Sequence, residues 1–450
     1  MTYLEINAGD TAWVLVSAAL VLLMTPALAF FYGGMVRSKG VLNMMMMSVV
    51  SMGIVGVLWV LYGYSMAFGN SWHGLVGNPL QFAGMRQVLD ATVGPEGHQI
   101  PMLAFAGFQS AFAIIAVALV SGAVADRMKF SAWVVFTAVW ASVCYFPAAH
   151  WVFAFDGFAA ERGGFIANSI KAFDFAGGTA IHINAGIAAL ALAVVLGPRI
   201  GFRATPMRPH NLTLVMLGAG LLWFGWFGFN AGSALAANAL AGLAWVNTLA
   251  AASAAMLAWL ATERVRDGHA TSLGGASGIV AGLVAITPAC AVVTPLGSLA
   301  IGALAGVSCA LAIGAKYRLG FDDALDVVGV HLVGGLVGTL AVGLFAKGSL
   351  AGGSAGLFYG GGVEQLARQA LGAAVVLVFG FVVTWLLARA IDATIGLRVD
   401  EAAERNGIDL GEHAENGYDL SRVQYSRYSR SIRVPAPVVE TDSQEAEATA

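Results

Sequence analysis

Charged residues are scarce in this chain of 450 residues, because Asp, Glu, Lys and Arg together make up only 11% of it. Soluble domains carry about 25%, so the composition excludes an ordinary water-facing surface. Hydrophobic residues make up 58%. The stretches 11–36, 41–85 and 213–262 contain no charged residue, and a helix needs about 20 mainly apolar residues to cross a bilayer. We therefore expect an all-α polytopic membrane protein.

Cysteine is also rare, with only Cys144, Cys290 and Cys309 in the chain. All three fall in or at the ends of apolar stretches, and such an odd, scattered set indicates neither a disulfide framework nor a metal site. Gly-rich phosphate-binding loops are missing, which argues against transport driven by nucleotide hydrolysis in this chain. No basic segment precedes the first apolar stretch, so we expect no cleavable signal peptide.

The apolar stretches predict eleven membrane-spanning helices. One set of connections carries thirteen Lys and Arg residues, whereas the opposite set carries five. Because positive residues are retained on the cytoplasmic side, we expect the N-terminus outside and the C-terminus inside the cell membrane. The predicted spans are 11–35, 41–67, 101–125, 130–155, 175–197, 211–235, 239–262, 271–289, 294–315, 327–346 and 366–391.

Two lone histidines stand in otherwise lipid-soluble stretches, His182 eight residues after Asp174 and His331 eight residues after Asp323. An ionisable residue inside a span is costly and marks a functional hypothesis. The two spans enter from opposite sides, so eight residues at about 1.5 Å each bring both imidazoles near the midplane of a core about 30 Å thick, about 6 Å apart in depth. Matched spacing in opposed directions predicts an inverted repeat of spans 1–5 and 6–10, with span 11 added.

Several roles are open to such a pair. A hydrogen-bonded place in the core is the plain alternative to a pore lining. A metal site would need three or four ligands, and no third His, Cys or carboxylate is placed at that depth. The His-Glu-x-x-His pattern of metalloproteases is missing too. Two imidazoles in an apolar lumen offer one donor and one acceptor to a small polar solute that gains and loses a proton near neutral pH.

Aromatic residues and glycines alternate at positions 223–233, in the order Trp-Phe-Gly-Trp-Phe-Gly-Phe-Asn-Ala-Gly-Ser. The plain interpretation is an aromatic belt at the membrane interface. Phe112, Trp151 and Phe153 are predicted to reach the same side of the membrane. Ring faces attract a partly desolvated cation, and the Ser233 hydroxyl can accept a hydrogen bond from it. The pattern also suits an outer vestibule for a small cation.

Five motifs stand in order along the chain: Phe31-Tyr-Gly-Gly-Met-Val-Arg-Ser-Lys39, Asp174-Phe-Ala-Gly-Gly-Thr-Ala-Ile-His182, Gly225-Trp-Phe-Gly-Phe-Asn-Ala-Gly-Ser233, Thr287-Pro-Ala-Cys290 and Asp326-Val-Val-Gly-Val-His331. Over residues 11–413 the chain resembles the ammonium transporter family (Amt/Mep/Rh), and its bacterial Amt branch in particular. The resemblance implies a transporter or channel for ammonium and ammonia rather than an enzyme, with no cofactor. It also implies a homotrimer with one pore in each subunit, and methylammonium as a substrate analogue.

The resemblance implies an outer ammonium site lined by Phe112, Phe229 and Ser233, whose two rings also act as a gate. Asp174 would lie below it as a structural or electrostatic carboxylate. The family usually has a Trp in this aromatic cage, and here Phe153 stands in its place. A phenyl ring binds a cation more weakly than an indole and lacks its N–H donor, so we expect a weaker outer site.

Deeper in the membrane, the resemblance makes His182 and His331 the twin pore histidines. Trp226 and Thr287 would contribute to the wall, and Asp323 would be the cytoplasmic-side repeat mate of Asp174. Ammonium would lose a proton at the outer site, and neutral ammonia would pass the two imidazoles and regain a proton inside. The released proton could be relayed separately along the imidazoles.

Two other functions compete with transport. An ammonium sensor with little flux would bind at the vestibule and signal through its tail, but the chain has no kinase or cyclase domain. An enzyme built on the His pair lacks a nucleophile or metal set. Uptake of methylammonium separates transport from sensing.

The composition shifts near Gly396, where a transmembrane domain (1–395) is predicted to give way to a cytoplasmic tail (396–450). Residues 400–413 are acidic. Residues 396–413 resemble the family's tail, which couples subunits and helps to dock a PII-type regulatory protein. A passive solvated end is the alternative. From about Ser421 the composition predicts disorder. No nucleic acid partner is expected.

Overall fold

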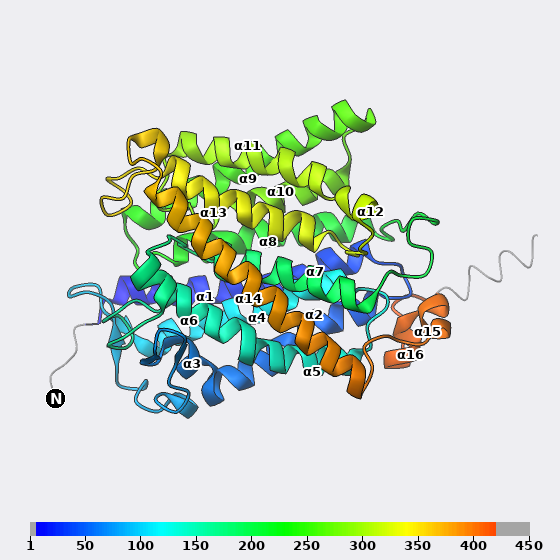
Figure 1. The fold of residues 1–450 in the computed structure, drawn as a ribbon, viewed down its shortest axis with the longest axis horizontal. Coiled ribbons are helices and arrows are strands. Elements are labelled where there is room, and N and C mark those ends of the chain that lie inside the picture. The colour runs from blue at the N-terminus through cyan, green and yellow to red at the C-terminus, as the bar shows by residue number, and fades with distance from the viewer. Residues whose placement is uncertain (1–5, 420–450) are drawn as a thin grey trace, which may run out of the picture.

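Helices form nearly the whole fold, and most of them run along the long axis of the molecule (Figure 1). The structure is a computed structural model, and it describes residues 6–419. The α-helices are α1 (Ala8–Met35), α2 (Val41–Leu58), α3 (Tyr64–Phe68), α4 (Met102–Val120), α5 (Phe130–Trp140), α6 (Phe146–Phe153), α7 (Asn184–Leu196), α8 (Leu212–Gly232), α9 (Ala239–Asp267), α10 (Ser272–Ile286), α11 (Pro295–Ala312), α12 (Ala315–Leu319), α13 (Val333–Phe345), α14 (Glu364–Thr394), α15 (Glu401–Asn406) and α16 (Ile408–His413).

Shorter elements interrupt or connect these helices. The π-helical segments are η1 (Trp59–Gly63), η4 (Ala141–Tyr145), η5 (Ile166–Ile170), η6 (Gly178–Ile183) and η7 (Val328–Leu332), and the 3-10 turns are η2 (Ala83–Met85), η3 (Ser121–Val124) and η8 (Leu357–Tyr359). Two small antiparallel hairpins pair β1 (Ser71–Trp72) with β2 (Val76–Gly77) and β3 (Thr92–Val93) with β4 (Ile100–Pro101).

Ten helical stretches in residues 6–419 are long and apolar enough to cross a membrane. The prediction of a polytopic helical membrane protein is therefore confirmed. A further apolar helix, α10, has 15 residues and coincides with the eighth predicted span. A count of eleven crossings includes α10 and stays a prediction, as does the orientation in the membrane.

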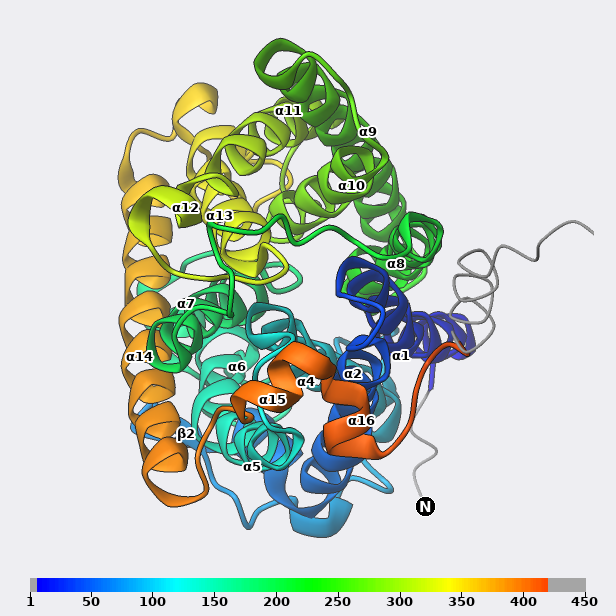
Figure 2. The same cartoon turned by 90° about the vertical axis from the view of Figure 1, so that its right-hand side faces the viewer.

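The two ends of the bundle carry different connections. At the end where α1 begins, called here the amino end, lie both hairpins and the long connection before α14 (Figure 1). At the opposite end, called the carboxyl end, lie α12, α15 and α16 (Figures 1 and 2). The described chain therefore begins and finishes at opposite ends of the bundle.

Close packing between helices depends on small residues. A Cβ atom on Gly186, in α7, would lie 2.4 Å from the backbone nitrogen of Leu332, in η7. A Cβ atom on Gly338, in α13, would lie 2.0 Å from the carbonyl oxygen of Ala285, in α10. Small residues let helix backbones approach closely in lipid. The approach of α7 to η7 brings together the two segments that contain the histidines.

The predicted tail packs against the carboxyl end of the bundle. Asp409 accepts hydrogen bonds from the backbone N–H groups of Leu42 and Asn43 at 3.1 and 2.8 Å, where α2 begins. Glu412 accepts one at 2.8 Å from Phe130, where α5 begins. Carboxylates at helix N-termini satisfy free N–H groups and complement the helix dipole.

Residues 409 and 412 thus attach the tail to the bundle, and a regulatory role of residues 396–413 stays a prediction. The disorder predicted from about Ser421 onward falls outside the described residues.

Replacing Gly186 with Ala tests the contact between α7 and η7. The added methyl group collides with backbone rather than with a flexible side chain, so we expect the free energy of unfolding to fall by about 1–3 kcal/mol. Thermal unfolding of the purified protein measures the change. Gly107→Ala is the matched control, because no atom lies within 4 Å of a Cβ at that exposed helical position. Equal melting temperatures for the two variants would contradict this account.

Candidate functional site

Asp174 is buried where the chain turns into the segment that contains His182. Its Oδ1 accepts hydrogen bonds from the backbone N–H groups of residues 177 and 178, at 2.7 Å each. Its Oδ2 accepts hydrogen bonds from those of residues 179 and 180, at 2.7 and 3.1 Å. These are the N–H groups that a helix start leaves unpaired. Gly177 makes the turn possible with a φ of 124°. The carboxylate thus anchors the segment and has four of its lone-pair directions occupied.

Asp323 occupies the matching place in the second half of the chain. Its two oxygens accept hydrogen bonds from the N–H groups of Val327 and Val328 at 3.1 and 2.7 Å. Burial raises the pKa of this carboxyl group to about 6, against the opposing effect of the Lys316 ammonium. Asp174 and Asp323 therefore cap two segments in the same way, one at each end of the bundle, and each cap stands eight residues before a histidine.

Both histidines lie in π-helical turns rather than in the regular α-helix assumed for the eight-residue spacing. In η6 the N–H of His182 donates to the carbonyl of Gly177, five residues earlier, at 3.0 Å. In η7 the N–H of Val333 likewise reaches the carbonyl of Val328. Hydrophobic periodicity carries no sign of such local widening. Single π-turns inside helices are frequent at functional sites.

The two imidazoles lie in direct contact. Nδ1 of His331 is 3.2 Å from Nδ1 of His182, and the ring planes differ by 19°. Both side chains are buried, with 1% and 3% of their residue surface exposed for His182 and His331. The prediction that the pair lies within mutual reach is confirmed, whereas its role in a pore stays a proposal.

The contact determines where the hydrogens can be. One Nδ1 must donate to the other, so a neutral pair has one ring with its hydrogen on Nδ1 and the other with its hydrogen on Nε2. The two Nε2 atoms then differ: one is a free acceptor and the other is an N–H donor. Nε2 of His182 has no hydrogen-bond partner in the structure. The pair can therefore present one acceptor and one donor to a small polar molecule beside it.

Trp226 and Phe229 complete the wall around His182. Their ring centroids lie 5.5 and 6.0 Å from that imidazole, and the planes are within 23° of parallel. The indole Nε1 of Trp226 donates to the hydroxyl of Thr287 at 2.9 Å. That hydroxyl donates in turn to the carbonyl of Leu283 at 2.8 Å. Trp226 is thus held in place by a satisfied polar contact, with Thr287 behind it.

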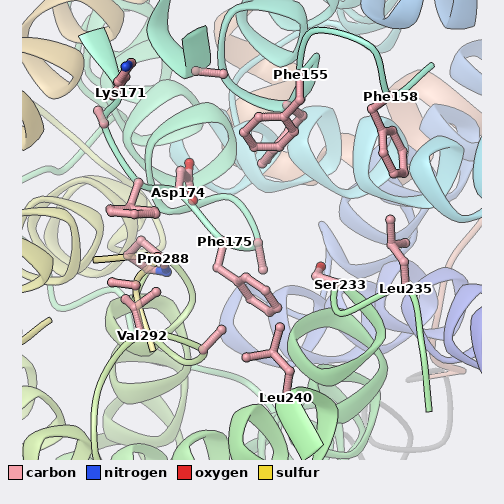
Figure 3. Close-up of a pocket in the computed structure, with 18 of the residues that line it drawn as sticks. Phe155, Phe158, Lys171, Asp174, Phe175, Ser233, Leu235, Leu240, Pro288 and Val292 are labelled. Carbon is pink, nitrogen blue, oxygen red and sulfur yellow. The ribbon is translucent and has the colours of Figure 1, made fainter. Parts of the chain in front are cut away.

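A cavity of about 500 Å³ opens at the amino end of the bundle (Figure 3). Four of the predicted site residues line it: Phe112, Phe153, Asp174 and Ser233. The Ser233 hydroxyl donates to the carbonyl of Phe229 at 2.8 Å, which leaves its lone pairs free to accept. We call this cavity the vestibule.

Phe112 and Phe229 lie below the vestibule, with ring centroids 4.5 Å apart. Beyond them the free space shrinks to two voids of about 10 Å³ each. His331 borders both voids, and His182 borders the one nearer the vestibule. Each void is close to the smallest space that can hold a water molecule. Each of these two positions therefore has room for no more than one molecule of about the size of water.

Trp151 does not face the vestibule. Its Nε1 donates to the carbonyl of Leu75 at 2.6 Å, and its ring packs against Phe165 and Phe379. Phe153, two residues later, lines the cavity instead. Residues two apart on a helix point in different directions, so the indole cannot replace the phenyl ring there.

Some residues of the site were not predicted as site residues, although Asp326 begins one of the five motifs. Asp326 borders the void at the carboxyl end, with a φ of 63°, and its Oδ1 accepts from Lys316 Nζ at 2.6 Å. Lys171 and Arg368 line the vestibule although they are far apart in the chain. Polar residues at predicted span ends are common, and only the fold shows which of them meet. In residues 6–419 no three His, Cys, Asp or Glu side chains form a metal-binding cluster.

Comparison with known proteins gives consistent matches. A model of the Ammonium Transporter Family matches residues 12–418. An ammonium transporter of Mycobacterium tuberculosis is 62% identical over 434 residues, which cover 92% of this chain and 91% of that protein. Among solved structures, a Sensor Amt Protein superposes with a TM-score of 0.82 at 30% identity, covering 90% of this chain and 98% of the other. Mep2 of Candida albicans has a TM-score of 0.82 at 29% identity, covering 92% and 94%.

Proposed function

Since the chain belongs to the ammonium transporter family, we propose that it takes up ammonium at the vestibule and conducts it past the His pair as ammonia. The coarse function, ammonium transport by a multi-pass membrane protein, follows from the family. The route of ammonium and ammonia through the protein is what we propose here. It is supported above all by the 3.2 Å contact between His182 and His331 in a lumen with room for only one very small molecule at a time.

Binding begins at the Phe112 end of the vestibule. The faces of Phe112 and Phe153 attract a cation, and the Ser233 oxygen accepts one of its hydrogen bonds. Loss of bulk water disfavours the charged form and lowers the pKa of bound ammonium. Asp174 contributes by anchoring η6, since its oxygens already accept four hydrogen bonds.

Conduction then proceeds as neutral ammonia. The narrow void directly below the gate is lined mainly by apolar side chains, where an unpaired charge would be very costly. At the His pair, the free Nε2 acceptor and the Nε2–H donor match a molecule that both donates and accepts. Potassium has no proton to lose and cannot shed its water shell cheaply, so the same lumen excludes it. The proton could travel separately along the two imidazoles.

Orientation and assembly complete the proposal. The excess of Lys and Arg in one set of connections places the vestibule outside and the tail in the cytoplasm of a cell membrane. The outward-facing apolar residues of the helices provide the lipid contacts and the contacts between subunits of a homotrimer.

Replacing His182 with Ala tests the role of the pair. The variant removes the hydrogen-bond partner of the buried His331, a loss worth about 1–3 kcal/mol. Uptake of labelled methylammonium, in cells without ammonium transporters of their own, should fall roughly five- to 100-fold. His73→Ala is the control, because His73 is exposed in a connection at the amino end. Unchanged transport in His182→Ala would overturn the relay, and no uptake by the unaltered protein would favour the sensor.

Replacing Phe153 with Trp tests the outer site. The larger ring face should strengthen the cation–π contact by about 0.5–1 kcal/mol, which lowers the Kd for ammonium about two- to fivefold. Calorimetric titration of the purified protein with ammonium chloride measures this. Phe358→Trp serves as control, since Phe358 is exposed and lies outside the cavity lining. Affinity that does not tighten would show that Phe153 takes no part in binding.

The tail is proposed to be a regulatory element that a PII-type protein recognises. Support comes from the carboxylates of Asp409 and Glu412, which cap α2 and α5 and so connect the tail to the transmembrane helices. A protein partner that binds these acidic residues would compete with the backbone N–H groups of α2 and α5 for the carboxylates. A sensing function would use the same connection.

Replacing Asp409 with Ala should release the tail. The variant leaves two N–H groups at the start of α2 without acceptors, and a loss of about 1–2 kcal/mol raises the undocked fraction about tenfold. Limited proteolysis followed by mass spectrometry should show faster cleavage within residues 396–419, with slower methylammonium uptake. Glu415→Ala is the control, because Glu415 is exposed. If both variants were cleaved at the rate of the unaltered protein, the caps would not hold the tail.

A further inference from the structure

The vestibule is far larger than its proposed substrate requires. Its volume, part of which is open to solvent, is about 500 Å³, whereas a molecule of the size of water or ammonium occupies about 30 Å³. Cavities of 300–1,000 Å³ are typical of sites that bind organic ligands. Its walls are chiefly apolar and include Phe105, Phe155, Phe158 and Phe173. The spare volume is therefore suited to an organic molecule.

One side of the vestibule favours a cation. Ser233 lies on this side, together with Phe158 and Leu235 (Figure 3). Phe112 belongs to the same side, since its ring lies 4.5 Å from that of Phe229, whose carbonyl accepts from Ser233. The proposed ammonium site occupies this side.

The opposite side is positively charged. Lys171 lies across the cavity from Ser233 (Figure 3), and it holds the left-handed backbone conformation at a φ of 60°. Arg368 joins it because the first turns of α14 run beside residues 171–173: Gln365 donates to the carbonyl of Lys171 at 3.4 Å, and Gln369 bonds both backbone groups of Phe173.

These positive charges are only weakly compensated. In residues 6–419 no carboxylate lies within ion-pair distance of Lys171, and Arg368 pairs only with Glu364, whose side chain is 73% exposed. Exposed pairs of this kind add little energy. Asp174 lies between the two sides (Figure 3), but its oxygens are occupied by four backbone N–H groups.

We propose that the vestibule binds a linear zwitterion, a primary ammonium group joined by an apolar chain to a carboxylate, which occupies the ammonium site without passing. The ammonium group takes the place of the substrate near Ser233, the methylene chain lies on the apolar floor of Phe175 and Val292, and the carboxylate meets Lys171 and Arg368. The closed rings of Phe112 and Phe229 and the small voids below prevent its passage. This inference rests on the proposed ammonium site, and it makes ω-amino acids competitive blockers.

Inhibition of labelled methylammonium uptake by 5-aminopentanoate tests the proposal. Proteoliposomes containing the full chain are compared in 5-aminopentanoate, n-pentylamine and pentanoate. The half-inhibitory concentration of 5-aminopentanoate should be about fivefold lower than that of n-pentylamine, because its carboxylate forms two partly exposed ion pairs. Pentanoate should not inhibit. In the double variant Lys171→Gln, Arg368→Gln the fivefold preference should vanish, with each variant compared with its own uninhibited uptake.

Lys347→Gln is the matched control, because Lys347 belongs to the connection between α13 and α14 but not to the cavity lining. Equal inhibition by the amine and the amino acid, a preference that survives in the double variant, or uptake of labelled 5-aminopentanoate would each overturn the proposal. Uptake without competitor reports the proposed function separately. Calorimetric titration of the purified protein with 5-aminopentanoate gives a second measure that does not depend on transport, and an absence of binding there would also overturn the inference.

Discussion

Buried carboxylates that accept backbone N–H groups are the constraint on which the lumen depends. Asp174 accepts four such bonds at the start of η6, and Asp323 accepts two at the start of η7. An unpaired N–H group in a membrane costs several kcal/mol, so each cap determines where its segment begins. The position of each histidine follows, because its imidazole stands a set number of residues after its cap. The 3.2 Å contact between the rings is thus a consequence of two distant caps.

The same caps explain why the path can be both polar and selective. A free carboxylate beside the lumen would hold ammonium as a cation and would attract other cations as well. Here the charge of Asp174 is offset by the four N–H groups whose hydrogen bonds it accepts. The void that both imidazoles border has no carboxylate among the described residues that line it, and Asp326, at the next void, is paired with Lys316. A small molecule that gives up its proton can enter such a lumen, whereas a permanent cation loses its hydration without compensation.

Sequence reasoning predicted the membrane class, the place of every long helix and the proximity of the two histidines. It succeeded because apolar length and the spacing from Asp to His are properties of one continuous stretch. It failed for distant residues that, unlike His182 and His331, are not related by a matched spacing. Lys171 and Arg368 reach one cavity only because α14 lies along residues 171–173. The π-turns at His182 and His331 were missed, since a local change of helical pitch leaves the hydrophobic pattern unaltered.

The vestibule is much larger than the voids below it. The difference follows if the vestibule serves binding and the voids serve conduction. The vestibule, at about 500 Å³, can select by charge and shape among many solutes, while voids of about 10 Å³ select by size alone. A solute that fits the vestibule in charge and shape but is too large for the voids remains above Phe112 and Phe229. If the vestibule binds the proposed zwitterion, flux can be controlled there from outside the lumen, and the side that carries Lys171 and Arg368 selects the solutes that block it.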